Sequence, residues 1–122
     1  MVLVDTSVWI DHFRQNEPEL AALLSEGDVL THPFVIGELS CGSLRNRTVV
    51  LSNLAELPAA VPASHEEALG LMQDRKLWGR GIGWVDAHLL AAALLSGCAL
   101  WTRDARLAEA AGAASVTRFR EA

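Results

Sequence analysis

Short runs of consecutive apolar residues alternate with longer amphipathic stretches along the whole chain. The first run, Val2–Val4, contains no polar residue and ends at Asp5, which is the pattern of a strand buried on both faces of a parallel sheet. Runs of the same kind predict strands at Val29–Leu30 and Cys98–Trp101, with short edge strands at Ala59–Val61 and Ser115–Phe119. We therefore expect a sheet built from these five short segments.

The stretches between the strands repeat apolar residues at helical spacing and carry helix start and stop signals. Ser64 with Glu67 three residues later forms a capping box, and Gly97 is the expected end of the most apolar helix. Helices are expected at Val8–Phe13, Glu19–Ser25, Phe34–Leu44, Thr48–Leu57, Ser64–Leu77, Val85–Leu95 and Ala105–Ala111. Alternation of strands and helices predicts an α/β three-layer sandwich with a central, mainly parallel five-stranded sheet, as one domain over residues 1–122.

Composition limits the class of protein further. The chain is 51% hydrophobic and 20% charged, which supports a folded core and argues against disorder. Cys41 and Cys98 lie far apart and belong to no Cys/His cluster, so we expect neither a disulfide framework nor a zinc site, and a cytoplasmic location fits best. The longest uncharged stretch, Ala87–Thr102, is shorter than the ~20 residues that a membrane span needs, so no membrane partner is expected.

The charge balance is acidic, but the positions of the acids change what it means. Fifteen acidic against ten basic residues leave a net charge of −5, whereas nucleic-acid binders are usually basic. Asp5 and Asp104 each follow a predicted strand, and α/β sheets bind ligands at the carboxyl ends of their strands. Glu38 lies inside the third predicted helix, and Asp86 lies in the first turn of the most apolar one.

Three of these acids also have an ordinary structural explanation. Asp5 and Asp104 could be helix N-caps, and Asp86 could be stabilised by the partial positive charge of a helix N-terminus. Glu38 has no such explanation, because burying an unpaired carboxylate in the middle of an apolar helix costs several kcal/mol.

Convergence of the four carboxylates would indicate a metal site. Carboxylates that meet at one spot raise each other's pKa unless a divalent cation lies among them. Mg²⁺ or Mn²⁺ is the expected ion, because both prefer oxygen ligands and the sequence offers no His or Cys cluster for zinc. Such ions activate water and stabilise leaving oxygens, which indicates phosphoryl chemistry.

Four segments follow one another in an order that is typical of one family. They are Val2–Ile10, Gly37–Leu39, Trp84–Ala92 and Leu100–Asp104. In this order and at this chain length they resemble the motifs of PIN-domain ribonucleases, and within that family the chain is similar to the VapC-type toxins of bacterial toxin–antitoxin pairs. The resemblance extends over essentially the whole chain.

The resemblance implies a five-stranded parallel sheet, Mg²⁺- or Mn²⁺-dependent endonucleolytic cleavage of RNA such as tRNA or rRNA, a homodimer, and inhibition by a cognate antitoxin protein. It assigns the catalytic acids to Asp5, Glu38, Asp86 and Asp104. In this assignment Asp5, Asp86 and Asp104 hold metal, and Glu38 orients the attacking water. Thr6, Ser7 and Thr102 occupy the supporting polar positions.

Further residues are candidates for contacts with RNA or a partner. Arg80, in the glycine-rich segment 79–83, and Arg103 could bind phosphate, and Trp84 could stack on an unpaired base, as could Trp78. A solvated arginine and a packed tryptophan are the alternatives. Apolar residues of the first two helices could form a groove for an antitoxin helix, with core packing as the alternative; they are Trp9, Ile10, Phe13, Leu20, Leu23 and Leu24.

Two other functional classes remain to be weighed. A metal-binding α/β signalling or binding module without nuclease activity also carries acids at strand ends, but a receiver-like domain needs an acceptor aspartate after a middle strand, and Thr48–Pro62 contains none. A phosphatase of the haloacid dehalogenase type would need an aspartate where Ser7 stands. Of the 15 acids, the proposed set takes 4 and leaves 11 against 10 bases, so the acidity is concentrated in the candidate site and predicts metal-dependent RNA binding.

Overall fold

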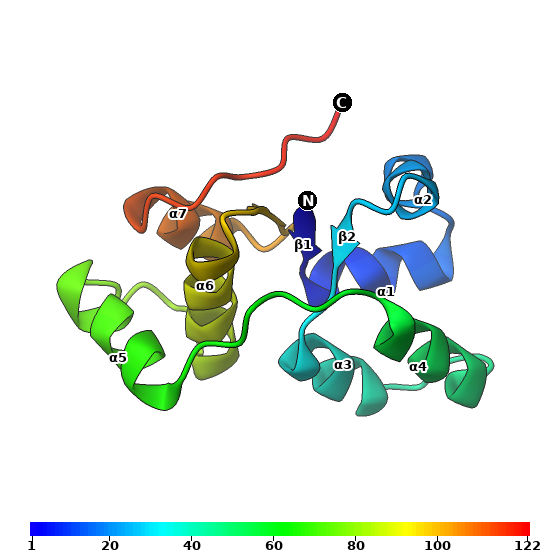
Figure 1. Ribbon diagram of the computed structural model, residues 1–122, viewed down its shortest axis with the longest axis horizontal. Coiled ribbons are helices and arrows are strands. Elements are labelled where there is room, and N and C mark those ends of the chain that lie inside the picture. The colour runs from blue at the N-terminus through cyan, green and yellow to red at the C-terminus, as the bar shows by residue number, and fades with distance from the viewer.

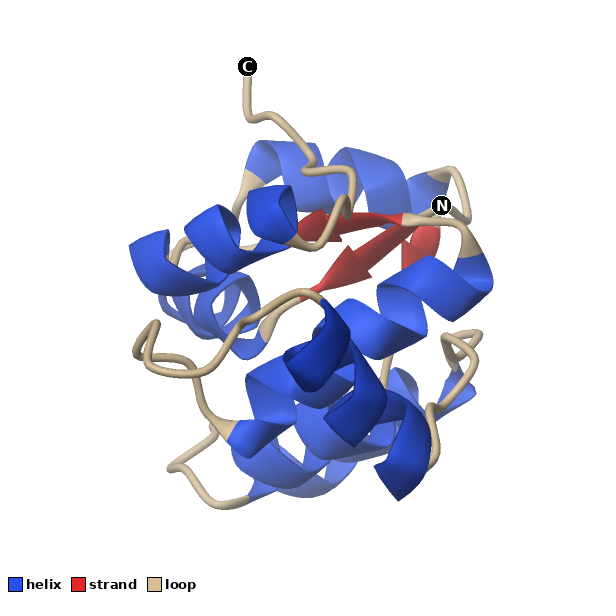
Figure 2. Cartoon of the chain, turned by 90° about the vertical axis from the view of Figure 1, so that its left-hand side faces the viewer, coloured by secondary structure: helices blue, strands red, loops and turns tan.

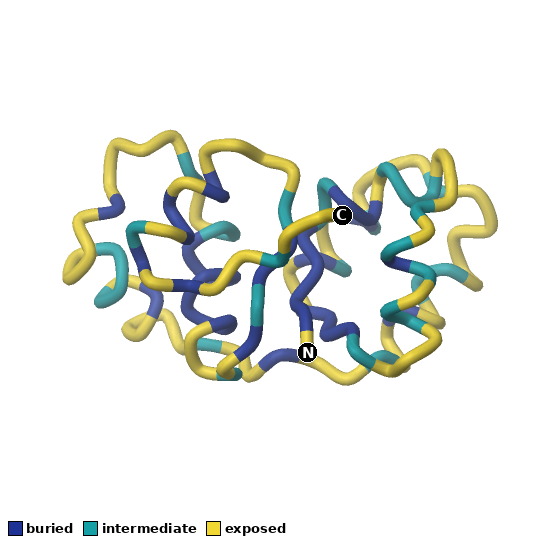
Figure 3. Tube along the Cα trace, turned by 90° about the horizontal axis from the view of Figure 1, so that it is seen from above, coloured by how far each residue is buried: buried dark blue, intermediate teal, exposed yellow.

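The computed structural model describes residues 1–122. Figure 1 shows the elements in chain order: β1 (Val2–Val4), α1 (Thr6–Arg14), α2 (Pro18–Ser25), β2 (Val29–Leu30), α3 (Pro33–Ser40), α4 (Arg47–Glu56), α5 (His65–Asp74), α6 (Trp84–Ser96), β3 (Ala99–Trp101) and α7 (Ala105–Ala113). The sheet lies between helices α1 to α4 on one side and α5 to α7 on the other (Figures 1 and 3). The expected α/β arrangement with helices on both sides of a parallel sheet is therefore confirmed.

The sheet has three parallel strands in the order β2-β1-β3, seen side by side in Figure 2. Val2 of the central strand pairs with Val29 on one side and with Ala99 on the other. Two single parallel bridges extend this order outward, Thr31 with Ala59 and Leu100 with Arg118. The expected edge segments are thus in place, but each pairs through only one bridge.

The prediction of five strands is therefore wrong in number. Pro58 and Pro62 flank the first edge segment, and proline has no N–H to continue a ladder of hydrogen bonds. At the other edge, Leu100 bonds to Thr117 and Phe119, and the chain beyond leaves the sheet, where Arg103 binds Glu121.

Burial explains why the central elements form. The three residues of β1 are all buried, and α6 buries seven consecutive residues, from Ala87 to Ala93. These elements belong to one hydrophobic core of 25 residues, which runs through the middle of the molecule in Figure 3. Gly97 ends α6 in the left-handed conformation with φ of 62°, which glycine adopts without steric cost. No helix is both long and apolar enough to cross a membrane.

Helix α3 is shorter than the expected Phe34–Leu44, and this changes the setting of Glu38. The hydroxyl of Ser40 donates to the Gly37 carbonyl at 2.6 Å, and Arg47 Nη2 donates to the Ser40 carbonyl at 2.9 Å. These bonds satisfy carbonyls at the end of the helix, where no backbone N–H follows to donate to them. Glu38 consequently lies in the last turn and is exposed, so the expectation of a carboxylate buried in mid-helix was wrong.

Replacing Leu89 by alanine should destabilise the fold by about 2–5 kcal/mol, because this α6 side chain is fully buried and its loss leaves a cavity. Leu95→Ala, on the same helix but 46% exposed, should cost less than about 0.5 kcal/mol. Urea unfolding of the two variants measures the difference, and equal losses would contradict the position assigned to α6.

Candidate active site

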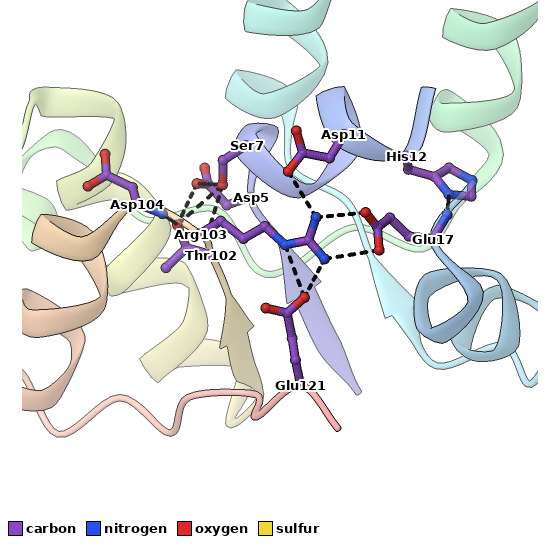
Figure 4. Close-up of polar contacts among 9 residues, drawn as sticks. All are labelled: Asp5, Ser7, Asp11, His12, Glu17, Thr102, Arg103, Asp104 and Glu121. Atoms are coloured by element: carbon purple, nitrogen blue, oxygen red, sulfur yellow. Dashed lines mark hydrogen bonds and ion pairs between the residues drawn. The ribbon is translucent and has the colours of Figure 1, made fainter. Parts of the chain in front are cut away.

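Asp5 lies at the carboxyl end of the central strand and is only 6% exposed. Its backbone N–H donates to the Trp101 carbonyl at 2.9 Å, which aligns the ends of β1 and β3. Its Oδ2 accepts hydrogen bonds from Ser7 Oγ at 2.8 Å and from Thr102 Oγ1 at 2.7 Å (Figure 4). Asp5 occupies the N-cap position of α1, as the structural interpretation expected, but its side chain makes no capping hydrogen bond.

The two hydroxyls also bind the loop that follows β3. Ser7 Oγ accepts from the backbone N–H of Arg103 at 3.1 Å, and Thr102 Oγ1 accepts from the backbone N–H of Asp104 at 3.0 Å. A hydroxyl has one hydrogen to donate and lone pairs to accept. Each hydroxyl therefore donates to Asp5 and accepts from the loop, and in this way the structure joins Asp5 to the 102–104 segment.

Glu38 is joined to the same region by Thr6. Thr6 Oγ1 donates to Glu38 Oε1 at 2.7 Å, although the two residues are 32 positions apart in sequence. Thr6 follows Asp5 directly, so the first turn of α1 contacts two of the four candidate acids. The supporting positions expected for Thr6, Ser7 and Thr102 all carry hydroxyls bonded to a candidate acid.

Asp86 lies in the first turn of α6, where its Oδ2 accepts the backbone N–H of Gly83 at 3.1 Å. Burial raises the pKa of Asp86 above its usual range, and the nearby negative charges of Asp5, Asp104 and Glu38 raise this pKa further, against the lowering effect of the Gly83 hydrogen bond. Asp86 therefore lies within electrostatic range of the other three acids.

Asp104 acts as the N-cap of α7. Its Oδ1 accepts from the backbone N–H groups of Arg106 at 2.9 Å and Leu107 at 3.3 Å. The structural explanation offered for Asp104 is thus confirmed, as is the position of Asp86 at a helix N-terminus. Each of these carboxylates stabilises a helix with one oxygen and has a second oxygen left.

The same division holds for all four acids. One oxygen accepts protein hydrogen bonds, and the other has no protein donor: Asp5 Oδ1, Glu38 Oε2, Asp86 Oδ1 and Asp104 Oδ2. No lysine or arginine forms an ion pair with them, because the three salt bridges of the structure all belong to Arg103. Unpaired carboxylate oxygens without a neighbouring imidazole or thiol suit Mg²⁺ or Mn²⁺.

The side chains do not form a finished metal cage. No group of three or more His, Cys, Asp or Glu side chains is arranged to hold a metal ion. The donor chemistry of the four acids, oxygen atoms alone, is the kind that hard divalent cations prefer.

The candidates for RNA contact lie in different settings. Arg80 is exposed, and its Nε donates to the Lys76 carbonyl at 3.3 Å. Trp84 is 41% exposed at the start of α6. The centroid of its ring lies 4.7 Å from that of the His88 ring and 5.1 Å from that of the His65 ring. Trp78 is 62% exposed. Trp9 and Trp101 are 2% and 1% exposed and belong to the core.

Arg103 lies beside the acids in sequence, but its guanidinium is bound elsewhere. It contacts three carboxylates that sequence analysis did not identify as part of any site: Asp11, Glu17 and Glu121 (Figure 4). No local pattern could have paired these residues, because 92, 86 and 18 positions separate them from Arg103.

Asp86→Asn should stabilise the metal-free protein near neutral pH. The folded pKa of Asp86 is raised, so its ionised form destabilises the fold; this destabilisation is absent below pH ~3.9 and grows as pH rises through the raised pKa. Asparagine keeps an oxygen for the Gly83 N–H. Thermal unfolding in EDTA between about pH 3 and pH 8 measures the difference, with the exposed Asp74→Asn as control. Identical unfolding midpoints of wild type and Asp86→Asn above pH ~6 would contradict it.

Comparison with known proteins agrees with this geometry. Residues 2–113 match the family model of the PIN domain. The chain is 48% identical to Ribonuclease VapC32 of Mycobacterium tuberculosis, in the strains CDC 1551 and H37Rv, over 99% of this chain and 98% of that protein.

Two solved structures share the fold at low sequence identity. FitAcB from Neisseria gonorrhoeae superposes with a TM-score of 0.67 at 21% identity, covering 98% of this chain and 97% of the other. PAE2754 from Pyrobaculum aerophilum superposes with a TM-score of 0.58 at 18% identity, covering 87% of this chain and 76% of the other. Together with the family match and the full-length identity to VapC32, they show that this chain belongs to the PIN-domain family and, within it, to the VapC ribonuclease toxins.

Proposed function

We propose that this VapC-type ribonuclease is a metal-dependent endoribonuclease that cleaves RNA at the four acids and is neutralised by a cognate antitoxin. The observation that carries the proposal is the set of four gathered carboxylates, each with one oxygen free of protein donors and none paired with a basic side chain. The 48% identity to a protein named as a ribonuclease supports it. The same identity argues against the alternative, a metal-binding module without nuclease activity, and the RNA cleavage assay with Asp5→Asn decides between them.

The residues of the site have three roles in this proposal: binding metal, positioning the acids and orienting the attacking water. Asp5, Asp86 and Asp104 would hold Mg²⁺ or Mn²⁺, an ion that would supply activation of water and neutralisation of phosphate charge. Ser7 and Thr102 fix Asp5 through Oδ2, and the N-terminal turns of α6 and α7 fix Asp86 and Asp104. Thr6 holds Glu38 by Oε1, which leaves Oε2 to orient the attacking water.

RNA is the substrate in this proposal, with tRNA or rRNA as candidate classes. Trp84 lies two residues before Asp86 and exposes its ring, so it could stack on an unpaired base beside the acids. Arg80 is exposed in the adjoining glycine-rich segment and could bind a flanking phosphate. The third candidate, Arg103, has its guanidinium occupied by carboxylates.

An antitoxin would dock on the surface where α1 and α4 meet, between α3 on one side and α2 on the other. Two cavities lie there, of about 720 Å³ and about 200 Å³, and Phe13 and Val50 line both. Ile10, Leu44 and Glu38 also line the larger cavity, so an apolar segment docked there would reach a catalytic acid. Trp9 and Leu24 line the smaller cavity as expected, whereas Leu20 is fully buried in the core and cannot line a groove.

The proposal also includes a homodimer, which rests on the family resemblance alone. Sedimentation velocity of the purified protein would test it directly.

Asp5→Asn should reduce RNA cleavage roughly a hundredfold or more, because the substitution removes a charge from the metal-binding set. Cleavage of total RNA by the wild type should require Mg²⁺ or Mn²⁺ and stop in EDTA. Asp74→Asn, an exposed acid at the end of α5, is the matched control and should retain activity. Cleavage that persists in EDTA, or in Asp5→Asn, would refute the metal-nuclease proposal.

Val50→Glu should weaken neutralisation by the antitoxin at least about tenfold, because it places a charge at the apolar boundary that the two cavities share. Val49→Glu, its neighbour on α4 that is 59% exposed and lines neither cavity, is the matched control. Growth of cells that express each toxin variant with the small protein encoded beside it reports neutralisation. Equal rescue of the two variants would place the antitoxin on another face.

A further inference from the structure

The guanidinium of Arg103 joins three parts of the chain that are distant in sequence. Nη1 donates to Asp11 Oδ2 of α1 at 2.9 Å and to Glu17 Oε1, before α2, at 2.8 Å. Nη2 donates to Glu17 Oε2 at 3.0 Å and also to Glu121, and Nε donates to Glu121 Oε1 at 3.0 Å. Figure 4 shows the guanidinium enclosed by these carboxylates, and we call the four residues the Arg103 cluster.

The cluster uses every donor that Arg103 has. An arginine side chain carries five N–H groups in a planar fork, and five hydrogen bonds to carboxylates occupy them. Glu17 takes two parallel bonds, the geometry in which arginine binds carboxylate most strongly. No donor is left for an RNA phosphate unless the cluster opens.

The backbone of the same residue lies within the acid site. Arg103 N–H donates to Ser7 Oγ, whose hydrogen goes to Asp5. On either side of Arg103 stand Thr102, which donates to Asp5, and Asp104, one of the candidate acids. Arg103 is thus the middle residue of a three-residue loop whose other two members, Thr102 and Asp104, belong to the site. Its side chain fixes this loop through contacts that lie outside the site.

Helix α1 connects the two regions. Ser7 and Asp11 lie four residues apart and hence on one face of the helix. Ser7 binds the backbone of Arg103, and Asp11 binds its side chain. Two successive turns of α1 therefore bind Arg103, one through its backbone and the next through its side chain.

We propose that Arg103 is a positioning residue of the acid site: the Arg103 cluster holds the 102–104 loop against α1 and so sets the placement of Thr102 and Asp104 relative to Asp5. This inference rests on the proposed nuclease function and replaces the sequence-based expectation that Arg103 binds phosphate. Its distinguishing consequence is that carboxylates outside the set of four candidate acids, above all Glu17 of the Arg103 cluster, determine the rate of the chemical step.

The test uses two variants of the cluster, Glu17→Gln and Arg103→Lys, with kcat and KM measured on one RNA substrate. In Glu17→Gln the amide has only one oxygen, so it cannot accept both hydrogen bonds from the guanidinium. In Arg103→Lys the positive charge remains, but the three N–H donors of lysine radiate from one nitrogen instead of forming a planar fork. Each variant should lower kcat about tenfold or more, because small misplacements of catalytic groups are costly, and should leave KM within about twofold.

Matched controls are exposed residues outside the cluster that make no side-chain hydrogen bond. Glu26→Gln changes the charge as Glu17→Gln does, and Arg120→Lys repeats the arginine substitution near the same end of the chain. Both controls should keep kcat within about twofold of the wild type.

A phosphate-binding role for Arg103 predicts the opposite pattern. Glu17→Gln would then release N–H groups and lower KM, and Arg103→Lys would leave kcat unchanged because lysine also binds phosphate. Either result, or cluster variants that behave like their controls, would overturn the proposal.

A second readout separates failure of this proposal from failure of the proposed function. Mn²⁺ binding, followed by paramagnetic broadening of the Thr102 and Asp104 amide signals, should weaken at least about tenfold in Glu17→Gln and stay unchanged in Glu26→Gln, because support around metal ligands contributes about this much to affinity. This holds even if no RNA is cleaved. If Glu17→Gln does not fold, Glu121→Gln, which removes the outermost carboxylate, takes its place in both measurements. Unchanged Mn²⁺ affinity in a folded variant would refute the positioning role.

Discussion

The structure depends on a buried carboxylate that receives hydroxyl hydrogen bonds instead of a cation. Asp5 ends the central strand at 6% exposure, and the hydroxyls of Ser7 and Thr102 are its only side-chain partners. Hydroxyl donors compensate in part for the cost of burial but leave the charge in place. The same two hydroxyls bind the loop after β3, so the contacts of Asp5 also fix the segment that carries Asp104.

The distribution of basic residues leaves the negative charge of the whole site without a basic partner in the protein. The fold brings Asp86 within reach of three other negative charges and gives it no basic partner, while the guanidinium of Arg103 serves three carboxylates outside the site. Repulsion that the chain does not neutralise itself raises the pKa of Asp86 and favours the binding of a cation. In our proposal a divalent cation and then an RNA phosphate fill that role, so the acidity is a requirement for substrate binding.

Helix α1 shows how a single short element serves several tasks. Its first turn holds Asp5 and Glu38 through Ser7 and Thr6, Asp11 reaches the Arg103 cluster, and Ile10 and Phe13 line the groove. Helical spacing places Ser7 and Asp11 on one face, and Thr6, Ile10 and Phe13 on another. One short helix therefore contributes side chains to the acids, to the Arg103 cluster and to the larger cavity.

Much of this arrangement could be predicted from the sequence, because its signals are local. An apolar run that stops at Asp5 marks the end of a buried strand, and the motifs around Asp86 and Asp104 place acids at a helix N-terminus and at a strand end. Other predictions failed where the outcome depended on distant contacts. Glu38 proved exposed because Ser40 and Arg47 end α3 early, and the edge segments pair through single bridges.

The sequence by itself therefore determined the order of the elements and the family, and it supplied the four acids of the proposal. Only the tertiary structure decided which oxygen of each acid stays free and that the five donors of Arg103 are occupied by Asp11, Glu17 and Glu121. The physical reason is that strand and helix signals depend on neighbouring residues, whereas hydrogen bonds between side chains up to 97 positions apart depend on how the whole chain packs.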